Sequence, residues 1–93
     1  MFLDFNEIVT DLLLYKMSEN DKSFLASQPK ERLIRLHNTL GQAIRNIYKL
    51  WDEENPYTVK DYEPIVVNGA DENPKHPDNF SYAIIEAVWK KLQ

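Results

Sequence analysis

The sequence LIRLHNTLGQAIRNIYKLW, residues 33–51, carries the clearest structural pattern in the chain. Its apolar residues recur at steps of three and four, the spacing that places side chains on one face of an α-helix. This row consists of Leu33, Leu36, Leu40, Ile44, Ile47 and Trp51. The pattern predicts a helix of about five turns. Gly41 lies within it at a cost of about 1 kcal/mol relative to alanine, so we expect the first or the last helix to cross closely there.

Similar spacing predicts three more helices, over residues 5–17, 19–26 and 79–92. Ser18 followed by Asp21 resembles a capping box, in which a hydroxyl accepts a hydrogen bond from a free backbone N–H at the start of a helix. We expect the short second helix to contribute Phe24 and Leu25 to the core. Pro29 should lie in the first turn of the long helix, where its missing N–H would be unpaired anyway.

The segment between the long helix and the last helix follows different rules. Four of the five prolines fall within residues 56–77, so this segment cannot form a long helix. Residues 65–67, Ile-Val-Val before Asn68-Gly69, have strand character, although no partner strand is obvious. The predicted fold is therefore all-α, with about four helices in one bundle-like domain, residues 1–93, and a long irregular acidic loop before the last helix.

The net charge of −4 is distributed unevenly along the chain. Residues 1–28 carry −3, residues 29–51 carry +4, residues 52–79 carry −6 and residues 80–93 carry +1. An acidic chain offers no basic surface for phosphates, so we do not expect nucleic-acid binding. The bases of the long helix are expected in salt bridges or in contact with water.

Composition excludes several kinds of site. The chain has no cysteine, so there is no disulfide framework and no thiolate metal site. Only two glycines are present, which leaves no phosphate-binding loop. His37 and His76 fall on different elements, so we expect no catalytic site, no bound metal and no cofactor. No apolar run approaches the roughly 20 residues of a membrane span, and the acidic N-terminal segment is unlike a signal peptide, so we expect a cytoplasmic protein.

The acidic segment 52–79 holds the candidate binding residues. It places aromatic rings among carboxylates, a combination suited to a basic protein surface, because charge speeds encounter and rings supply burial. The candidate contact residues are Glu53, Glu54, Tyr57, Asp61 and Tyr62. In the alternative interpretation, the loop folds over the helices and its tyrosines cover the core. The two interpretations are compatible.

A resemblance to a known family rests on two groups of residues. The first is Leu36-His37-x-x-Leu40-Gly41-x-x-Ile44-Arg45-Asn46 followed by Leu50-Trp51, and the second is His76-Pro77-Asp78 with Ser81, Ile84-Ile85 and Trp89. In these residues the chain resembles an uncharacterised family of small helical domains found in bacteria and phages. The resemblance covers residues 5–51 and 75–92, leaves 55–74 unmatched, and implies a helical fold with no known activity.

The same residues predict a contact that ties the last helix to the long helix. We expect Arg45 or Asn46 to form a hydrogen bond with Asp78 or with the backbone near His76.

These observations predict a small non-enzymatic protein-binding module of bacterial or phage origin, for example an inhibitor of a host or defence protein. The alternative function is an immunity protein or antitoxin that neutralises a basic toxin. Two further alternatives stay open. One is an enzyme that uses His76 and Asp78, and the other is a homodimer built on the apolar faces of the long helix and the last helix.

Overall fold

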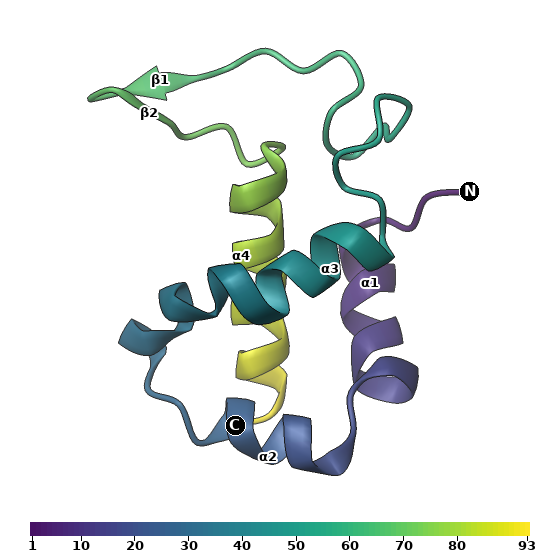
Figure 1. Cartoon of the computed structure of the whole chain (residues 1–93), viewed down its shortest axis with the longest axis vertical. Coiled ribbons are helices and arrows are strands. Elements are labelled where there is room, and N and C mark those ends of the chain that lie inside the picture. The colour runs from purple at the N-terminus through teal and green to yellow at the C-terminus, as the bar shows by residue number, and fades with distance from the viewer.

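Helix α4 (Pro77–Lys91) lies at the centre of the computed structural model, which describes all 93 residues (Figure 1). Helix α3 (Gln42–Ile47) crosses it, α1 (Phe5–Asp11) lies to one side, and α2 (Glu19–Ala26) lies near its C-terminal end. The predicted fold class, all-α with about four helices and an irregular connection before the last, is confirmed. No helix has the length and apolar character needed to cross a membrane.

The first helix begins at a capping box that the sequence reading missed. Asp4 Oδ1 accepts a hydrogen bond from the Glu7 N–H at 2.8 Å, and Glu7 Oε1 accepts one from the Asp4 N–H at 3.0 Å. The helical stretch ends at Lys16, one residue before the predicted end, and its second half, η1 (Leu12–Lys16), is wound as a wider π-helix. Two buried side chains, Ile8 and Val9, turn α1 toward the core.

Helix α2 has the predicted boundaries, and its capping box is confirmed. Ser18 Oγ accepts from the Asp21 N–H and Asp21 Oδ2 accepts from the Ser18 N–H, both at 3.1 Å. Leu25 is buried, as expected. The expectation for Phe24 is wrong, because its side chain is 57% exposed. A helix of two turns can place only one narrow face against the core, and in this helix Leu25 is the residue on that face.

The long predicted helix is present as three segments of different winding. A 3₁₀ segment, η2 (Lys30–Leu36), leads into a π segment, η3 (His37–Gly41), and then into α3. Leu36 marks the first change, with φ −86° and ψ 3°. Pro29 precedes the first turn with extended backbone instead of lying within it, so that detail of the prediction is wrong.

The predicted apolar face of the long helix is buried at its start and exposed at its end. Leu33 and Ile44 are fully buried, whereas Ile47 and Trp51 are exposed. The helix ends at Ile47, and Lys49 then adopts a left-handed backbone with φ 54°. This turn directs Leu50 into the core in place of Trp51.

Helix α4 begins two residues earlier than predicted. His76 caps it, because Nδ1 of its ring accepts the Asp78 backbone N–H at 3.1 Å. Gly41 packs against this helix: a Cβ atom there would lie 3.7 Å from Ile85 Cδ1 and 3.0 Å from Arg45 Nη1. The last helix therefore lies at ordinary contact distance from Gly41, and the tight contacts there are with Arg45 and, at 3.3 Å, the Leu36 carbonyl oxygen of the same segment. One continuous core of twelve buried side chains surrounds the crossing, namely Ile8, Val9, Leu12, Leu25, Leu33, Ile44, Tyr48, Leu50, Phe80, Ile84, Ile85 and Val88.

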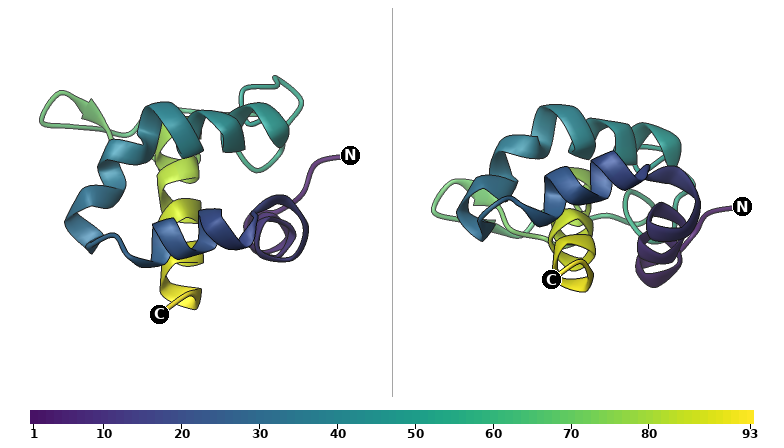
Figure 2. Two further views of the ribbon diagram at one scale, coloured as in Figure 1. Left: turned by 60° about the horizontal axis from the view of Figure 1, so that its bottom comes forward. Right: turned by 90° about the horizontal axis from the view of Figure 1, so that it is seen from below.

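The strand expected near residue 66 finds a partner within the same turn. β1 (Val66–Val67) pairs antiparallel with β2 (Ala70–Asp71), in the register Val67 with Ala70. Asn68 and Gly69 both have positive φ, 51° and 81°, which identifies a hairpin turn of the I′ type. The hairpin projects from the helices at the end of the molecule where α4 begins (Figures 1 and 2).

Candidate functional site

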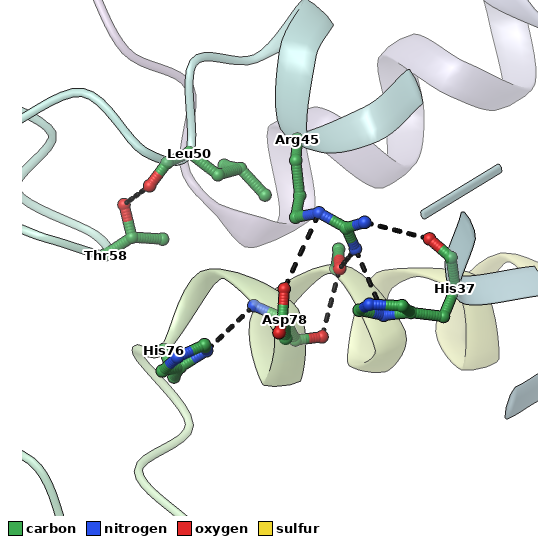
Figure 3. Close-up of polar contacts among 7 residues, drawn as sticks. His37, Arg45, Leu50, Thr58, His76 and Asp78 are labelled. Atoms are coloured by element: carbon green, nitrogen blue, oxygen red, sulfur yellow. Dashed lines mark hydrogen bonds and ion pairs between the residues drawn. The ribbon is translucent and has the colours of Figure 1, made fainter. Parts of the chain in front are cut away.

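The connection between α3 and α4 is fixed onto the turn that follows α3 by two fully buried polar side chains. Thr58 Oγ1 donates to the Leu50 carbonyl oxygen at 2.7 Å (Figure 3), and Asn55 Nδ2 donates to the Lys49 carbonyl oxygen at 3.1 Å. Asn55 Oδ1 also accepts the Tyr57 backbone N–H at 2.9 Å. These hydrogen bonds satisfy buried polar groups and fix the path of residues 49–60.

Four of the five candidate contact residues lie at the surface of this connection. Glu53, Glu54, Tyr57 and Asp61 are exposed. Tyr62 is not: it is half-buried, its hydroxyl is enclosed, and its ring packs edge-on against His76 with centroids 6.0 Å apart. The structure therefore separates Tyr62 from the other four residues.

Most carboxylates of the connection have no ion-pair partner. Glu54 lies 3.9 Å from Lys60, the one ion pair in this part of the chain. Asp52 Oδ1 accepts the Glu54 backbone N–H at 2.9 Å. Glu53 and Asp61 face solvent without a cation within 4 Å, so the surface keeps its negative charge.

Three asparagine and aspartate side chains fix the base of the hairpin. Asn73 Nδ2 donates to the Glu63 carbonyl oxygen at 2.6 Å, and Asn79 Nδ2 donates to the Asp71 carbonyl oxygen at 2.8 Å. Asp71 Oδ1 accepts the Ile65 and Asn73 backbone N–H groups at 3.2 and 3.0 Å. This arrangement was not predicted; the signal for the hairpin was the Asn68-Gly69 pair that follows an apolar run.

Arg45 forms a buried polar contact between the helical segments (Figure 3). It is 7% exposed, and its Nη2 donates to the His37 carbonyl oxygen at 2.9 Å. Nη1 donates to Ser81 Oγ at 2.9 Å and lies 3.4 Å from His37 Nδ1. Nε lies 3.7 Å from Asp78 Oδ1.

Of the four residues expected to tie the helices, the structure brings two into direct contact, Arg45 and Asp78. Asn46 is exposed and takes no part, and His76 bonds the Asp78 backbone without a contact to Arg45. Ser81, buried and bonded to Arg45, was missed because a serine in an apolar helix gives no signal of its partner.

A second polar contact joins α1 to the end of α3. Tyr48 Oη donates to Asp11 Oδ2 at 2.5 Å, and Lys16 Nζ contacts the same oxygen at 3.0 Å. The hydrogen bond from Tyr48, and then that from Lys16, holds the pKa of Asp11 below its usual value. Burial, with the neighbouring Asp11 carboxylate, raises the pKa of Tyr48 far above its usual value.

An apolar groove of about 360 Å³ lies between the N-terminal helices and the α3 segment. Its lining is mostly apolar and consists of Leu12, Lys16, Met17, Asp21, Phe24, Leu25, Leu36, Thr39, Leu40, Ala43, Ile44 and Ile47. The exposed ring of Phe24 forms part of its wall. No group of three or more histidine, cysteine or acidic side chains has an arrangement that could hold a metal ion.

No protein-family model, curated protein or solved structure matches the chain. The family resemblance drawn from the sequence therefore stays a prediction, and function has to be inferred from the geometry of the chain itself.

Proposed function

We propose that this chain is a protein-binding module whose contact surface is the acidic connection between α3 and α4. The observation that supports this proposal is that the connection has a fixed backbone and also exposes acidic and aromatic side chains. Asn55 and Thr58 fix the connection onto the turn that follows α3. Glu53, Asp61 and Tyr57 are exposed on it.

The charge of the connection favours a partner with a basic surface. Residues 52–63 contain five acids and a single base, Lys60. Because only Glu54 is ion-paired, most of this charge is available to a partner. A negative patch accelerates encounter with a positive one and disfavours acidic partners.

Fixing the connection in advance lowers the entropic cost of binding. A loop that must order itself on contact loses part of its affinity to that ordering. Here the backbone of Tyr57 is already bonded to Asn55, so the point from which its side chain leaves the backbone is fixed. An aromatic ring so positioned is the kind of side chain that contributes most to protein interfaces.

Two finer functions follow from the same surface. An inhibitor of a host or defence protein and an immunity protein or antitoxin that neutralises a basic toxin both need a basic partner. They differ in what that partner is. A non-enzymatic role fits the use of both histidines in structural contacts, His76 as a helix cap and His37 beside Arg45.

Affinity capture followed by titration tests the proposal. A tag at the C-terminus leaves the surface free, because that end lies at the opposite end of α4 from the connection (Figure 1). The captured protein is purified, and its affinity is measured for the wild type and for Glu53→Lys, Tyr57→Ala and the control Glu31→Lys. Glu31 is an exposed acid without an ion pair, outside the connection.

We expect Glu53→Lys and Tyr57→Ala each to weaken binding about tenfold, and Glu31→Lys to change it less than about twofold. Affinity of the wild type should fall as salt rises from about 0.05 to 0.5 M. The proposal fails if no protein binds, if affinity is independent of salt, or if the control weakens binding as much as Glu53→Lys.

A further inference from the structure

The hairpin and its flanks form an acidic arm, residues 61–72, that reaches away from the helices (Figure 2). The arm contains four acids, Asp61, Glu63, Asp71 and Glu72, and no lysine or arginine. Its middle is apolar: the side chains of residues 65, 66 and 67 are 52%, 66% and 49% exposed. The fold gains little from these three side chains, because they lie outside its core.

The arm is held in one conformation although its tip is exposed. Asn73 bonds the Glu63 carbonyl and Asn79, on the first turn of α4, bonds the Asp71 carbonyl. The Glu72 N–H donates to the Ile65 carbonyl oxygen at 2.7 Å, which closes the ladder below the strands. An exposed apolar segment that is ordered in advance loses little entropy when a partner covers it.

The alternation of side chains along a strand constrains the shape of the partner. Successive residues of a strand point to opposite faces, so Ile65 and Val67 occupy one face of the hairpin and Val66 the other. Apolar surface is therefore exposed on both faces. A flat partner surface would cover one face only, whereas a cleft can cover both.

The negative charge of the arm indicates which kind of partner carries the cleft. Four carboxylates without a base disfavour nucleic acid and anionic membranes, because both carry negative charge. They also disfavour a second copy of this chain, which would bring like charges such as Glu63 and Glu72 of each arm together. A protein cleft with apolar walls and lysine or arginine at its rim satisfies both the side chains and the charges.

We infer that the arm inserts into an apolar cleft, rimmed by basic side chains, on the partner protein. This inference rests on the proposed function and specifies how its partner is recognised: Val66 and its neighbours supply burial, and the flanking acids pair with the rim.

Site-specific photocrosslinking locates the arm in the complex. A benzophenone amino acid replaces Val66 in one protein and Leu14 in another, each carrying the C-terminal tag. The two positions are matched, since Leu14 is 65% exposed and lies on η1, across the molecule from the hairpin (Figure 1). After irradiation with the purified partner, the crosslinked partner peptide is sequenced by mass spectrometry.

A substitution pair measures the contribution of the apolar tip. Val66→Thr with Val67→Thr keeps the branched side chains that favour strands but makes them polar. Leu14→Gln serves as the control at an equally exposed apolar position. Because all three side chains are exposed, melting temperatures should stay close to that of the wild type.

We expect a crosslink from position 66 to a partner peptide with apolar and basic residues, and no crosslink from position 14. We also expect the double threonine variant to bind the partner at least about tenfold more weakly than the wild type, and Leu14→Gln to bind as the wild type does. If the partner binds and Glu53→Lys weakens it, but the tip variant does not, the arm inference fails while the proposed function stands. If no protein binds, both the arm inference and the proposed function fail. A crosslink to a second copy also overturns the inference.

Discussion

Replacing Arg45 by alanine tests the contact that joins the α3 segment to α4. The substitution removes the hydrogen bonds from the guanidinium to the His37 carbonyl and to Ser81 Oγ, both 2.9 Å long. The His37 carbonyl then loses its donor, whereas Ser81 still donates to the Asp78 carbonyl oxygen at 3.0 Å. The ion pair with Asp78 contributes little, because that carboxylate is 42% exposed and screened by water.

The size of the effect follows from these contacts. Hydrogen bonds from a charged donor contribute about 1.5–3 kcal/mol each. Water that enters the space left by the side chain recovers part of the two bonds, so we expect a loss of about 3 kcal/mol in the free energy of unfolding. For a chain of this size, that loss corresponds to a fall of roughly 12–24 °C in Tm.

Thermal and urea denaturation followed by circular dichroism measures this loss. Arg35→Ala is the matched control, because Arg35 is exposed on η2 without an ion pair and should change stability by less than about 0.5 kcal/mol. Ser81→Ala should cost about 1 kcal/mol, and Asp78→Asn less than about 0.5 kcal/mol because its carboxylate is partly exposed. If Arg45→Ala melts no lower than Arg35→Ala, the guanidinium does not hold the helices together and the reasoning is refuted.

Four further substitutions test separate features. Gly41→Ala should lower stability by about 1–2 kcal/mol in urea unfolding, because a Cβ there would lie 3.0 Å from Arg45 Nη1 and 3.3 Å from the Leu36 carbonyl oxygen. A gain would show that these neighbours make room for the methyl group. Tyr48→Phe should reduce the loss of stability as the pH rises above about 10. The raised pKa of Tyr48 gives stability that is complete below about pH 10 and declines above it, and urea unfolding that shows an unchanged decline would contradict this. Asp11→Asn should reduce the loss in acid, since the lowered pKa of Asp11 gives stability that is present above about pH 4 and lost below it, as urea unfolding at acid pH would show. Gly69→Ala, at φ 81° with open space around it, should speed hydrogen exchange in the hairpin while Tm falls by less than about 4 °C.

Some helix boundaries could be predicted from local chemistry. The capping box at Ser18 and Asp21 and the proline-rich segment before α4 are both read from a few neighbouring residues. The winding of residues 30–47 could not be predicted, because a tight 3₁₀ segment followed by a wide π segment keeps the average period close to that of an α-helix. The left-handed turn at Lys49, which exposes Trp51, has no signature in the sequence.

The sequence was enough to predict the charge of the candidate surface, but not how its residues pack. Runs of acids such as Glu53-Glu54 have too little apolar character to be buried, so their exposure follows from composition. Tyr62 packs against His76 only because the chain returns to the start of α4, a contact between distant parts of the loop. The hairpin partner Ala70-Asp71 has low strand propensity, and it pairs because the Asn68-Gly69 turn brings it there.

The first turn of α4 connects the buried arginine to the acidic arm. Asp78 and Ser81 contact Arg45, while Asn79, between them in the sequence, bonds the Asp71 carbonyl at the base of the arm. The order of the arm therefore depends in part on this turn being formed and docked, because Asn79 holds one strand of its base. A partner that binds the ordered arm must in turn stabilise the docked helix, because a ligand of the native state raises its stability by mass action. Arg45→Ala should accordingly weaken partner binding although Arg45 is buried away from the interface, and saturating partner should restore part of the lost Tm.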